Sequence, residues 1–320
     1  MLFLLALLVW GALGLSFVRY LSSGAELVRL RNALLLEDAP ASHQWSPESV
    51  PADFKVDAGP VHPLFAGVVA DHALHTTGDD WAAALSVGRH LLPDDMRPNN
   101  PIKASLAETY ARIREHGEGY CGDVVEVFTA LLNAAGVFSR PWAFSFDGYG
   151  GHGHILSEIW DRQHKRWRLI DIYNNQYFLG ADGQPLSAME FRHHLISGEV
   201  FRGERVHPDA PPGYVYPEKA LDYYRRGAAQ WYMWWGNAVM ALDRHPAVKM
   251  ARRFGRPVEQ LAAILWQQYP RLRLLPDADP DTRDALAALR TRLKIFGWLG
   301  VAVLVIGIVS LVSSHWERVT

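Results

Sequence analysis

The sequence predicts an α+β domain flanked by two transmembrane helices. Residues 2–18 and 295–313 are apolar segments without a charged residue, and each is close to the ~20 residues that cross a bilayer as a helix. Between them, helical periodicity over 79–136 is followed by strand-like alternation over 140–173. A group of helices followed by a group of strands is typical of α+β proteins.

The composition is that of a globular protein. Hydrophobic residues make up 49% of the 320 residues and charged residues 21%, which excludes a disordered chain. The formal net charge of -2 argues against a nucleic-acid-binding protein, which usually presents a basic face. The chain has one cysteine, so an internal disulfide and a cysteine-rich zinc module are both excluded.

We expect residues 2–18 to form a transmembrane anchor. A cleaved signal peptide is the alternative, but the segment has no basic residue before it and no clear small-x-small cleavage site. Residues 19–60 are expected to form a juxtamembrane helix, over 25–36, and then a linker. Prolines at positions 40, 47 and 51 support the linker.

Residues 295–313 form the second expected span, and Trp298 stands where an interfacial aromatic residue is common. Basic residues flank both spans on the side of the middle region: Arg19, Arg29, Arg31, Arg290, Arg292 and Lys294. By the positive-inside tendency, this bias places the middle region in the cytoplasm. Because long domains cross membranes largely regardless of charge, a periplasmic location stays open.

Three helices precede the strands in the middle region. The first is expected over 79–92 and the second over 105–116, and each begins with a residue type that caps helices, Asp or Ser. The third begins at Cys121, carries apolar residues at helical spacing, and ends near Gly136.

Alternation predicts three strands after the third helix. They cover 140–148, 154–160 and 167–173. The last two form a hairpin that turns at about Gln163, which brings residue 155 opposite residue 171 in an antiparallel pair.

Cys121 is the candidate nucleophile. In the stretch GEGYCGD it stands at the start of the third helix with glycines on both sides. The thiolate is the nucleophilic form of cysteine, and a helix N-terminus stabilises an anion because its unpaired N–H groups point outward. The flanking glycines let a substrate approach the backbone closely. A buried cysteine without a chemical role is the plain alternative.

A cysteine nucleophile needs a base, and the base needs an acceptor that orients it. His154 begins the second strand and Asp171 lies on the third, so the predicted hairpin brings them side by side. His152 is the rival base. Glu158, on the strand of His154, is expected to form an ion pair or a hydrogen bond and not to act as a catalytic acid.

These motifs resemble those of the transglutaminase-like superfamily, cysteine enzymes related to papain in the layout of their catalytic residues. The matching segments are GYCGDVVEVFTALLNAAGVFSR, HILSEIW and RWRLIDIY, in the order of the family. The resemblance covers roughly residues 79–177. It implies that Cys121 is the nucleophile, His154 the general base and acid, and Asp171 the residue that orients the imidazole.

The resemblance also implies a domain over residues 61–200 with a papain-like core, in which the cysteine helix packs on an antiparallel sheet. The implied activity is that of a membrane-anchored enzyme without a cofactor, which cleaves amide or peptide bonds through a thioester or transfers the acyl group to an amine. Leu156 and Ile172 depart from the family pattern. The expected substrate is a protein or peptide, and these two departures leave the choice among such substrates open. A non-catalytic scaffold in a membrane or envelope polysaccharide assembly is the alternative.

A zinc site formed by Cys121, His152, His154 and Asp171 is a further alternative. Zinc accepts these ligand types, but His-Gly-His with one thiolate is not a structural zinc spacing. We therefore expect no metal.

Residues 201–294 are expected to form a helical, Trp-rich extension. Within it, residues 228–242 hold three tryptophans and a tyrosine, which we interpret as a helix packed in the core or on a partner. An interfacial helix beside the bilayer and a surface that stacks on sugars or lines a substrate cleft are the alternatives. The basic stretch 252–256 fits either anionic lipid headgroups or a solvated face.

Overall fold

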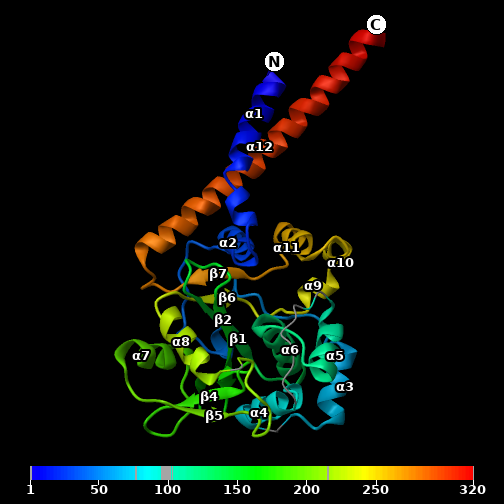
Figure 1. Cartoon of the computed structure of the whole chain (residues 1–320). Coiled ribbons are helices and arrows are strands. Elements are labelled where there is room, and N and C mark those ends of the chain that lie inside the picture. The colour runs from blue at the N-terminus through cyan, green and yellow to red at the C-terminus, as the bar shows by residue number, and fades with distance from the viewer. Residues whose placement is uncertain (1, 76–77, 95–101, 103, 215, 320) are drawn as a thin grey trace.

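The computed structural model describes residues 2–319 apart from 76–77, 95–101, 103 and 215. In this part of the chain, seven strands form one antiparallel sheet in the order β5-β4-β3-β2-β1-β6-β7. Helices pack around the sheet, and α1 and α12 project together from one end (Figure 1). The predicted mixture of helices with an antiparallel sheet is confirmed. The strands are β1 (Ser139–Ser145), β2 (Gly153–Asp161), β3 (Arg166–Asp171), β4 (Gln176–Leu179), β5 (Arg202–Arg205), β6 (Trp231–Trp235) and β7 (Arg271–Leu274).

One face of the sheet is covered by α6 and the helices around it. Val127, Phe128 and Leu131 of α6 share a core with Ile159 and Ile170 of the sheet. The predictions of helices over 79–92 and 105–116, and from Cys121 to near Gly136, are confirmed. The helices of this layer are α3 (Pro63–Asp71), α4 (Asp80–Leu91), α5 (Leu106–His116) and α6 (Cys121–Ala134).

The other face packs against α7 (Ala188–Ser197) and α8 (Pro217–Gly227). Phe191 and Tyr224 from these helices share a second core with Leu156 of β2. This core is rich in aromatic side chains, which bury large areas and favour edge-to-face contacts.

The prediction of a helix over 228–242 is wrong, because its tryptophans form strand β6. Trp231, Met233 and Trp235 point into the aromatic core, while Tyr232 and Trp234 point into a third core on the other side. All five side chains are buried, so the strand is apolar on both faces and shows no alternation in the sequence. In its described residues, the stretch 201–294, expected to be a helical extension, holds five helices or parts of helices and also the strands β5, β6 and β7, which join the sheet.

The third core lies under the remaining helices, at the end of the domain from which α1 and α12 project. There Leu35 of α2 and Leu286 of α12 pack with Leu272 and Leu274 of β7. The helices near this end are α2 (Gly24–Leu35), α9 (Ala241–Arg244), α10 (Pro246–Arg252) and α11 (Arg256–Leu265). Elsewhere along the chain, two short 3-10 helices cover Val18–Leu21 and Pro47–Ser49.

Helices α1 (Leu2–Leu15) and α12 (Pro280–Val319) pack along each other. The indole N–H of Trp10 donates to the carbonyl of Phe296 at 3.1 Å, and their rings stack 5.1 Å apart. A Cβ at Gly300 would lie 3.0 Å from Trp10, so the glycine permits this close approach.

Only one helix in the described part of the chain, over Pro280–Ser313, is long and apolar enough to cross a membrane. The α1 helix has 14 residues, which rise ~21 Å at 1.5 Å each. That length is below the ~30 Å of a typical hydrocarbon core. The chain therefore carries one span-length helix with a shorter apolar helix beside it.

Candidate active site

Cys121 is the first residue of α6, and a glycine turn sets that position. Gly119 has a φ of 105°, a conformation that glycine adopts far more easily than other residues. The Asp123 carboxylate then accepts a hydrogen bond of 2.9 Å from the N–H of Tyr120 and closes the first turn. Because the first N–H groups of a helix have no partner within the helix, the half-buried thiol stands beside donors that suit an anion.

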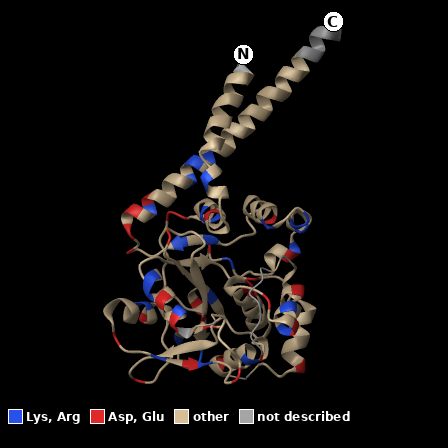
Figure 2. Ribbon diagram, viewed as in Figure 1, with Lys and Arg blue, Asp and Glu red and all other residues tan. Residues whose placement is uncertain are grey.

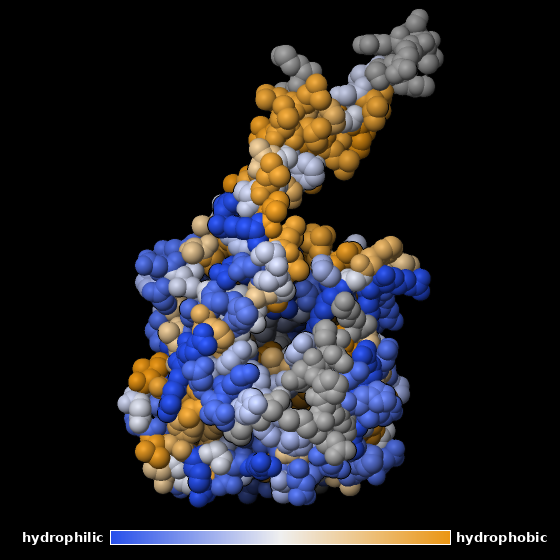
Figure 3. Space-filling view, in the orientation of Figure 1, coloured by the Kyte–Doolittle hydropathy of each residue, from blue (hydrophilic) through white to orange (hydrophobic). Residues whose placement is uncertain are grey.

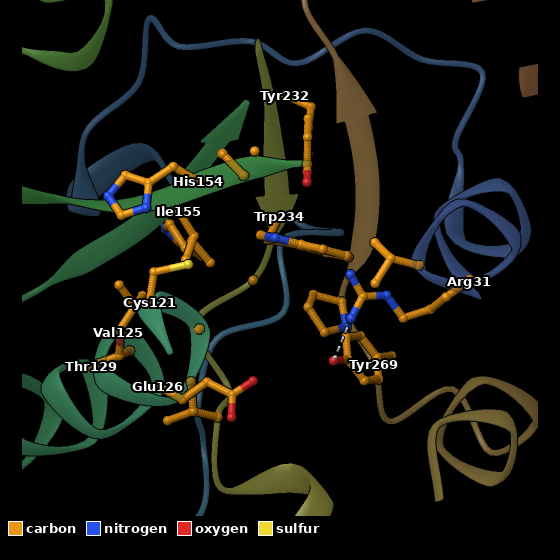
Figure 4. A pocket seen from close by; sticks show the side chains of 18 of the residues that line it. Arg31, Cys121, Val125, Glu126, Thr129, His154, Ile155, Tyr232, Trp234 and Tyr269 are labelled. Atoms are coloured by element: carbon orange, nitrogen blue, oxygen red, sulfur yellow. Dashed lines mark hydrogen bonds between the residues drawn. The ribbon is translucent and has the colours of Figure 1, made fainter. Parts of the chain in front are cut away.

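His154 lies between the thiol and a carboxylate. Its Nε2 is 2.7 Å from Oδ2 of Asp171, and Cys121 lies close enough to the ring to help raise the pKa of the imidazole. Since Asp171 occupies Nε2, Nδ1 is the nitrogen left for the sulfur, and the Tyr214 hydroxyl lies 3.3 Å from the same nitrogen. Figure 4 shows the sulfur and the imidazole side by side at one wall of a cavity. The structure thus brings together the three side chains that the sequence singled out.

The hairpin that joins His154 to Asp171 differs by one residue from the predicted register. Ser157 pairs with Ile170, so residue 156 is level with Asp171. His154 stands two residues before position 156 and shares its face of the sheet. The prediction that His154 and Asp171 are neighbours is confirmed, and the one-residue difference is what puts them on the same face.

The Asp171 carboxylate is fully buried and accepts four hydrogen bonds. Oδ2 accepts from His154, from Nδ2 of Asn174 at 2.9 Å and from the hydroxyl of Tyr224. Oδ1 accepts from the backbone N–H of Asn174 at 3.0 Å. Four donors around one buried carboxylate hold it in its ionised form and in one orientation.

The charges of the pair follow from these contacts. Burial opposes the ionised form of Asp171, but His154, Tyr224 and the N–H of Asn174 outweigh it and hold the pKa of Asp171 below its ordinary value. Burial likewise opposes the charged form of His154, but Asp171 and then Cys121 outweigh it and raise the pKa of His154 to about 10. At neutral pH the pair is therefore imidazolium and carboxylate, and a neighbouring imidazolium favours a thiolate.

A cavity of about 220 Å³ leads away from Cys121 and His154. Arg31 of α2 forms part of its far wall, where the guanidinium lies over the ring of Trp234 and its Nη1 is 3.5 Å from the hydroxyl of Tyr269. Glu126, on the same helix as Cys121, also lines the cavity, and burial raises the pKa of its carboxyl group to about 7. The cavity offers a substrate both apolar and charged walls (Figure 4).

Glu158 lies away from the cavity lining, in a buried ion pair, as expected for a structural role. Its Oε2 accepts from Nε of Arg140 at 2.6 Å and from the indole of Trp142 at 2.7 Å. The Arg140 guanidinium lies over the ring of Trp167, 3.8 Å from its centroid, and donates to the carbonyl of His43. Every polar atom of this cluster thus has a partner inside the aromatic core.

His152, the rival base, is exposed in the loop before β2, where its ring stacks on Phe146. It does not line the cavity that holds Cys121. Among the residues that the structure describes, no three His, Cys, Asp or Glu side chains form a group that could hold a metal ion.

Three residues of the site were not identified in the sequence. Asn174 follows Asp171 by three residues, a spacing at which an Asp side chain commonly accepts a hydrogen bond from a backbone N–H, and this spacing is a local signal. Tyr214 and Tyr224 come from segments 40 or more residues further along the chain, and no local pattern marks them.

Comparisons of the chain with protein-family models, with curated proteins and with solved structures found no match.

Proposed function

We propose that this protein is a membrane-anchored, transglutaminase-like cysteine enzyme that acts on amide or peptide bonds through a thioester. The observation that supports this function is the chain of contacts from the Cys121 thiol through His154 to the buried Asp171 carboxylate. A nucleophile, a base and an acceptor that orients the base are the parts that acyl transfer requires. The adjoining cavity gives the substrate carbonyl a place beside the sulfur.

The proposed first half-reaction forms the thioester. The Cys121 thiolate attacks the carbonyl carbon of the amide, and a tetrahedral intermediate forms whose oxyanion the backbone N–H of Cys121 helps to stabilise. The imidazolium of His154 gives its Nδ1 proton to the amine nitrogen as the C–N bond breaks. The amine leaves, and the acyl group stays on the sulfur.

In the second half-reaction, neutral His154 takes a proton from the attacking group. Water yields a carboxylic acid and a primary or secondary amine yields a new amide. Either one leaves the proton on His154 and releases the sulfur, which restores the imidazolium and the thiolate. Throughout the cycle the Asp171 carboxylate keeps the ring oriented and stabilises its charged form. Hydrolysis and transfer thus differ only in which nucleophile reaches the thioester.

Incorporation of a fluorescent primary amine into protein substrates by membranes that contain the full chain tests this function. We expect Cys121→Ser to abolish incorporation and thioester formation, and Glu158→Asp to retain activity as long as the domain is folded. Incorporation that persists in Cys121→Ser would refute the assignment of the nucleophile. If neither amide release nor incorporation depends on Cys121 with any donor, the scaffold role becomes the better proposal.

For the membrane, we propose that α12 crosses the bilayer, that the shorter α1 is inserted antiparallel beside it, and that the domain is cytoplasmic. Support comes from the packing of α1 along the apolar part of α12. Arg19 and Arg292 line one cavity, and Arg292 donates to Ser16, just after the end of α1. Figure 2 shows basic residues where the two helices meet the domain. Alkaline phosphatase fused to the C-terminus should then be active, because it needs a non-cytoplasmic compartment. The orientation would be reversed if the alkaline phosphatase fusion is inactive and a reporter that fluoresces only in the cytoplasm, fused at the same position, is fluorescent.

A further inference from the structure

Helices α10 and α11 expose apolar side chains over one continuous stretch of chain. Phe254 and Leu265 are 72% and 71% exposed. Within α11, Val258, Leu261 and Leu265 follow the spacing of three and four residues that places them on one stripe of a helix. We call the six large side chains of this surface the apolar ridge: Met250, Phe254, Val258, Leu261, Leu265 and Trp266.

Three charged side chains of the same helices point the other way, toward the domain: Arg252, Arg256 and Glu259. Arg252 pairs with Asp243 and with Glu259, each at 2.5 Å, and these groups are less than a fifth exposed. Arg256 donates to the carbonyl of Ile102 at 2.7 Å. A helix that faces water has its charges outside and its apolar stripe inside. In α11 this order is reversed, because both of its charged residues, Arg256 and Glu259, point inward while its apolar stripe is exposed. Exposed apolar surface of this kind marks a contact with something other than water.

The ridge lies at the end of the domain from which α1 and α12 project. Helix α11 packs on α2, which follows α1 in the chain, and Figure 1 shows α10 and α11 at that end. In the space-filling view, apolar surface continues from the two projecting helices onto this part of the domain (Figure 3). Lys249 and Arg253 are exposed next to Met250 and Phe254, where they suit anionic headgroups.

We propose that the apolar ridge is inserted in the headgroup region of the bilayer that α1 and α12 enter, with Lys249 and Arg253 on anionic lipid. A short helix that lies in the interface with its apolar face toward the acyl chains is a known mode of membrane contact. Residues 268–270 begin three residues after the end of α11 and line the cavity beside Cys121. The proposed contact therefore holds this part of the cavity wall at the bilayer surface. The inference rests on the membrane anchoring proposed above and is independent of the catalytic chemistry.

Site-specific fluorescence in the full chain tests this contact. With Cys121→Ser as background, Leu265→Cys is labelled with an NBD probe and reconstituted in phosphatidylethanolamine and phosphatidylglycerol vesicles that contain lipid with a doxyl quencher near the headgroup. We expect a blue-shifted emission and at least twofold stronger quenching than at the control Val200→Cys. Val200 is 84% exposed and precedes β5, at the sheet edge opposite β7.

Three results would overturn the inference. Equal emission and quenching at positions 265 and 200 would show that the ridge faces water. A blue-shifted but unquenched probe at 265 would show that protein, such as a second copy of the chain, covers it. A third label, Leu304→Cys in α12, reports insertion of the long helix in matching vesicles whose doxyl group lies deep in the acyl chain. If that probe is also unquenched, the anchoring fails and the ridge contact fails with it, while the chemistry proposed for Cys121 is unaffected.

Discussion

Asp171→Asn removes the charge that keeps the His154 imidazole cationic. In the folded protein the pKa of His154 lies at about 10 against an ordinary 6.5, which corresponds to a preference for the imidazolium of about 5 kcal/mol. Asn cannot supply this charge, and burial of the ring then favours neutral imidazole. Loss of even ~1.4 kcal/mol changes an ionised fraction tenfold, so we expect Cys121 to react with iodoacetamide at least tenfold more slowly at pH 7.

The assay is simple because the chain has one cysteine. Mass spectrometry follows carbamidomethylation at Cys121, and second-order rates are measured from pH 5 to pH 9. The wild-type rate should exceed the rate of Asp171→Asn throughout this range, because only the wild type keeps an imidazolium beside the sulfur. Asp182→Asn, which changes an exposed carboxylate in a turn, serves as the matched control and should follow the wild-type profile.

One outcome would refute this reasoning. If Asp171→Asn is folded by circular dichroism and its alkylation rate follows the wild-type profile across the whole range, the carboxylate does not control the thiol. A wild-type rate at pH 7 that equals the rate of free cysteine would refute the activation of Cys121 itself.

The remaining predictions concern stability and are measured by urea or thermal unfolding. Arg140→Met leaves a buried carboxylate without its partner and should cost about 3–5 kcal/mol of the free energy of unfolding, whereas Arg166→Met removes a partly exposed ion pair and should cost less than ~1 kcal/mol. Because folding raises the pKa of His154 from 6.5 to about 10, its ion pair stabilises the fold fully below pH 6.5 and progressively less up to pH 10. The wild-type melting temperature should therefore fall more steeply over that window than that of His154→Gln. Gly153→Ala would place a Cβ 1.9 Å from a carbonyl oxygen of β1 and should lower the melting temperature, while Gly67→Ala in α3 meets open space and should not lower it. Equal losses of unfolding free energy in the two arginine variants would contradict the first prediction. Parallel curves of melting temperature against pH for the wild type and His154→Gln would contradict the second, and equal melting temperatures of the two glycine variants would contradict the third.

Local patterns in the sequence were enough to predict the helix that begins at Cys121 and the hairpin that carries His154 and Asp171. A helix start depends on a glycine turn and on apolar residues three and four positions apart, all within a short stretch of chain. The hairpin depends on two alternating segments joined by a short turn. The predicted register of this hairpin differs from the observed one by one residue, because side-chain packing across the sheet selects the register.

Only the tertiary structure decided that Trp231–Trp235 is a strand, since a segment buried on both faces has no periodicity that distinguishes strand from helix. It also decided the partners of the site. The hydroxyl of Tyr224 reaches Asp171 across 53 residues of chain, and that of Tyr214 reaches His154 across 60. The sequence by itself was enough to single out Cys121, His154 and Asp171 and to predict the local elements that hold them. Their partners depend on which apolar surfaces are buried together, and that choice is made by the whole chain and not by neighbouring residues.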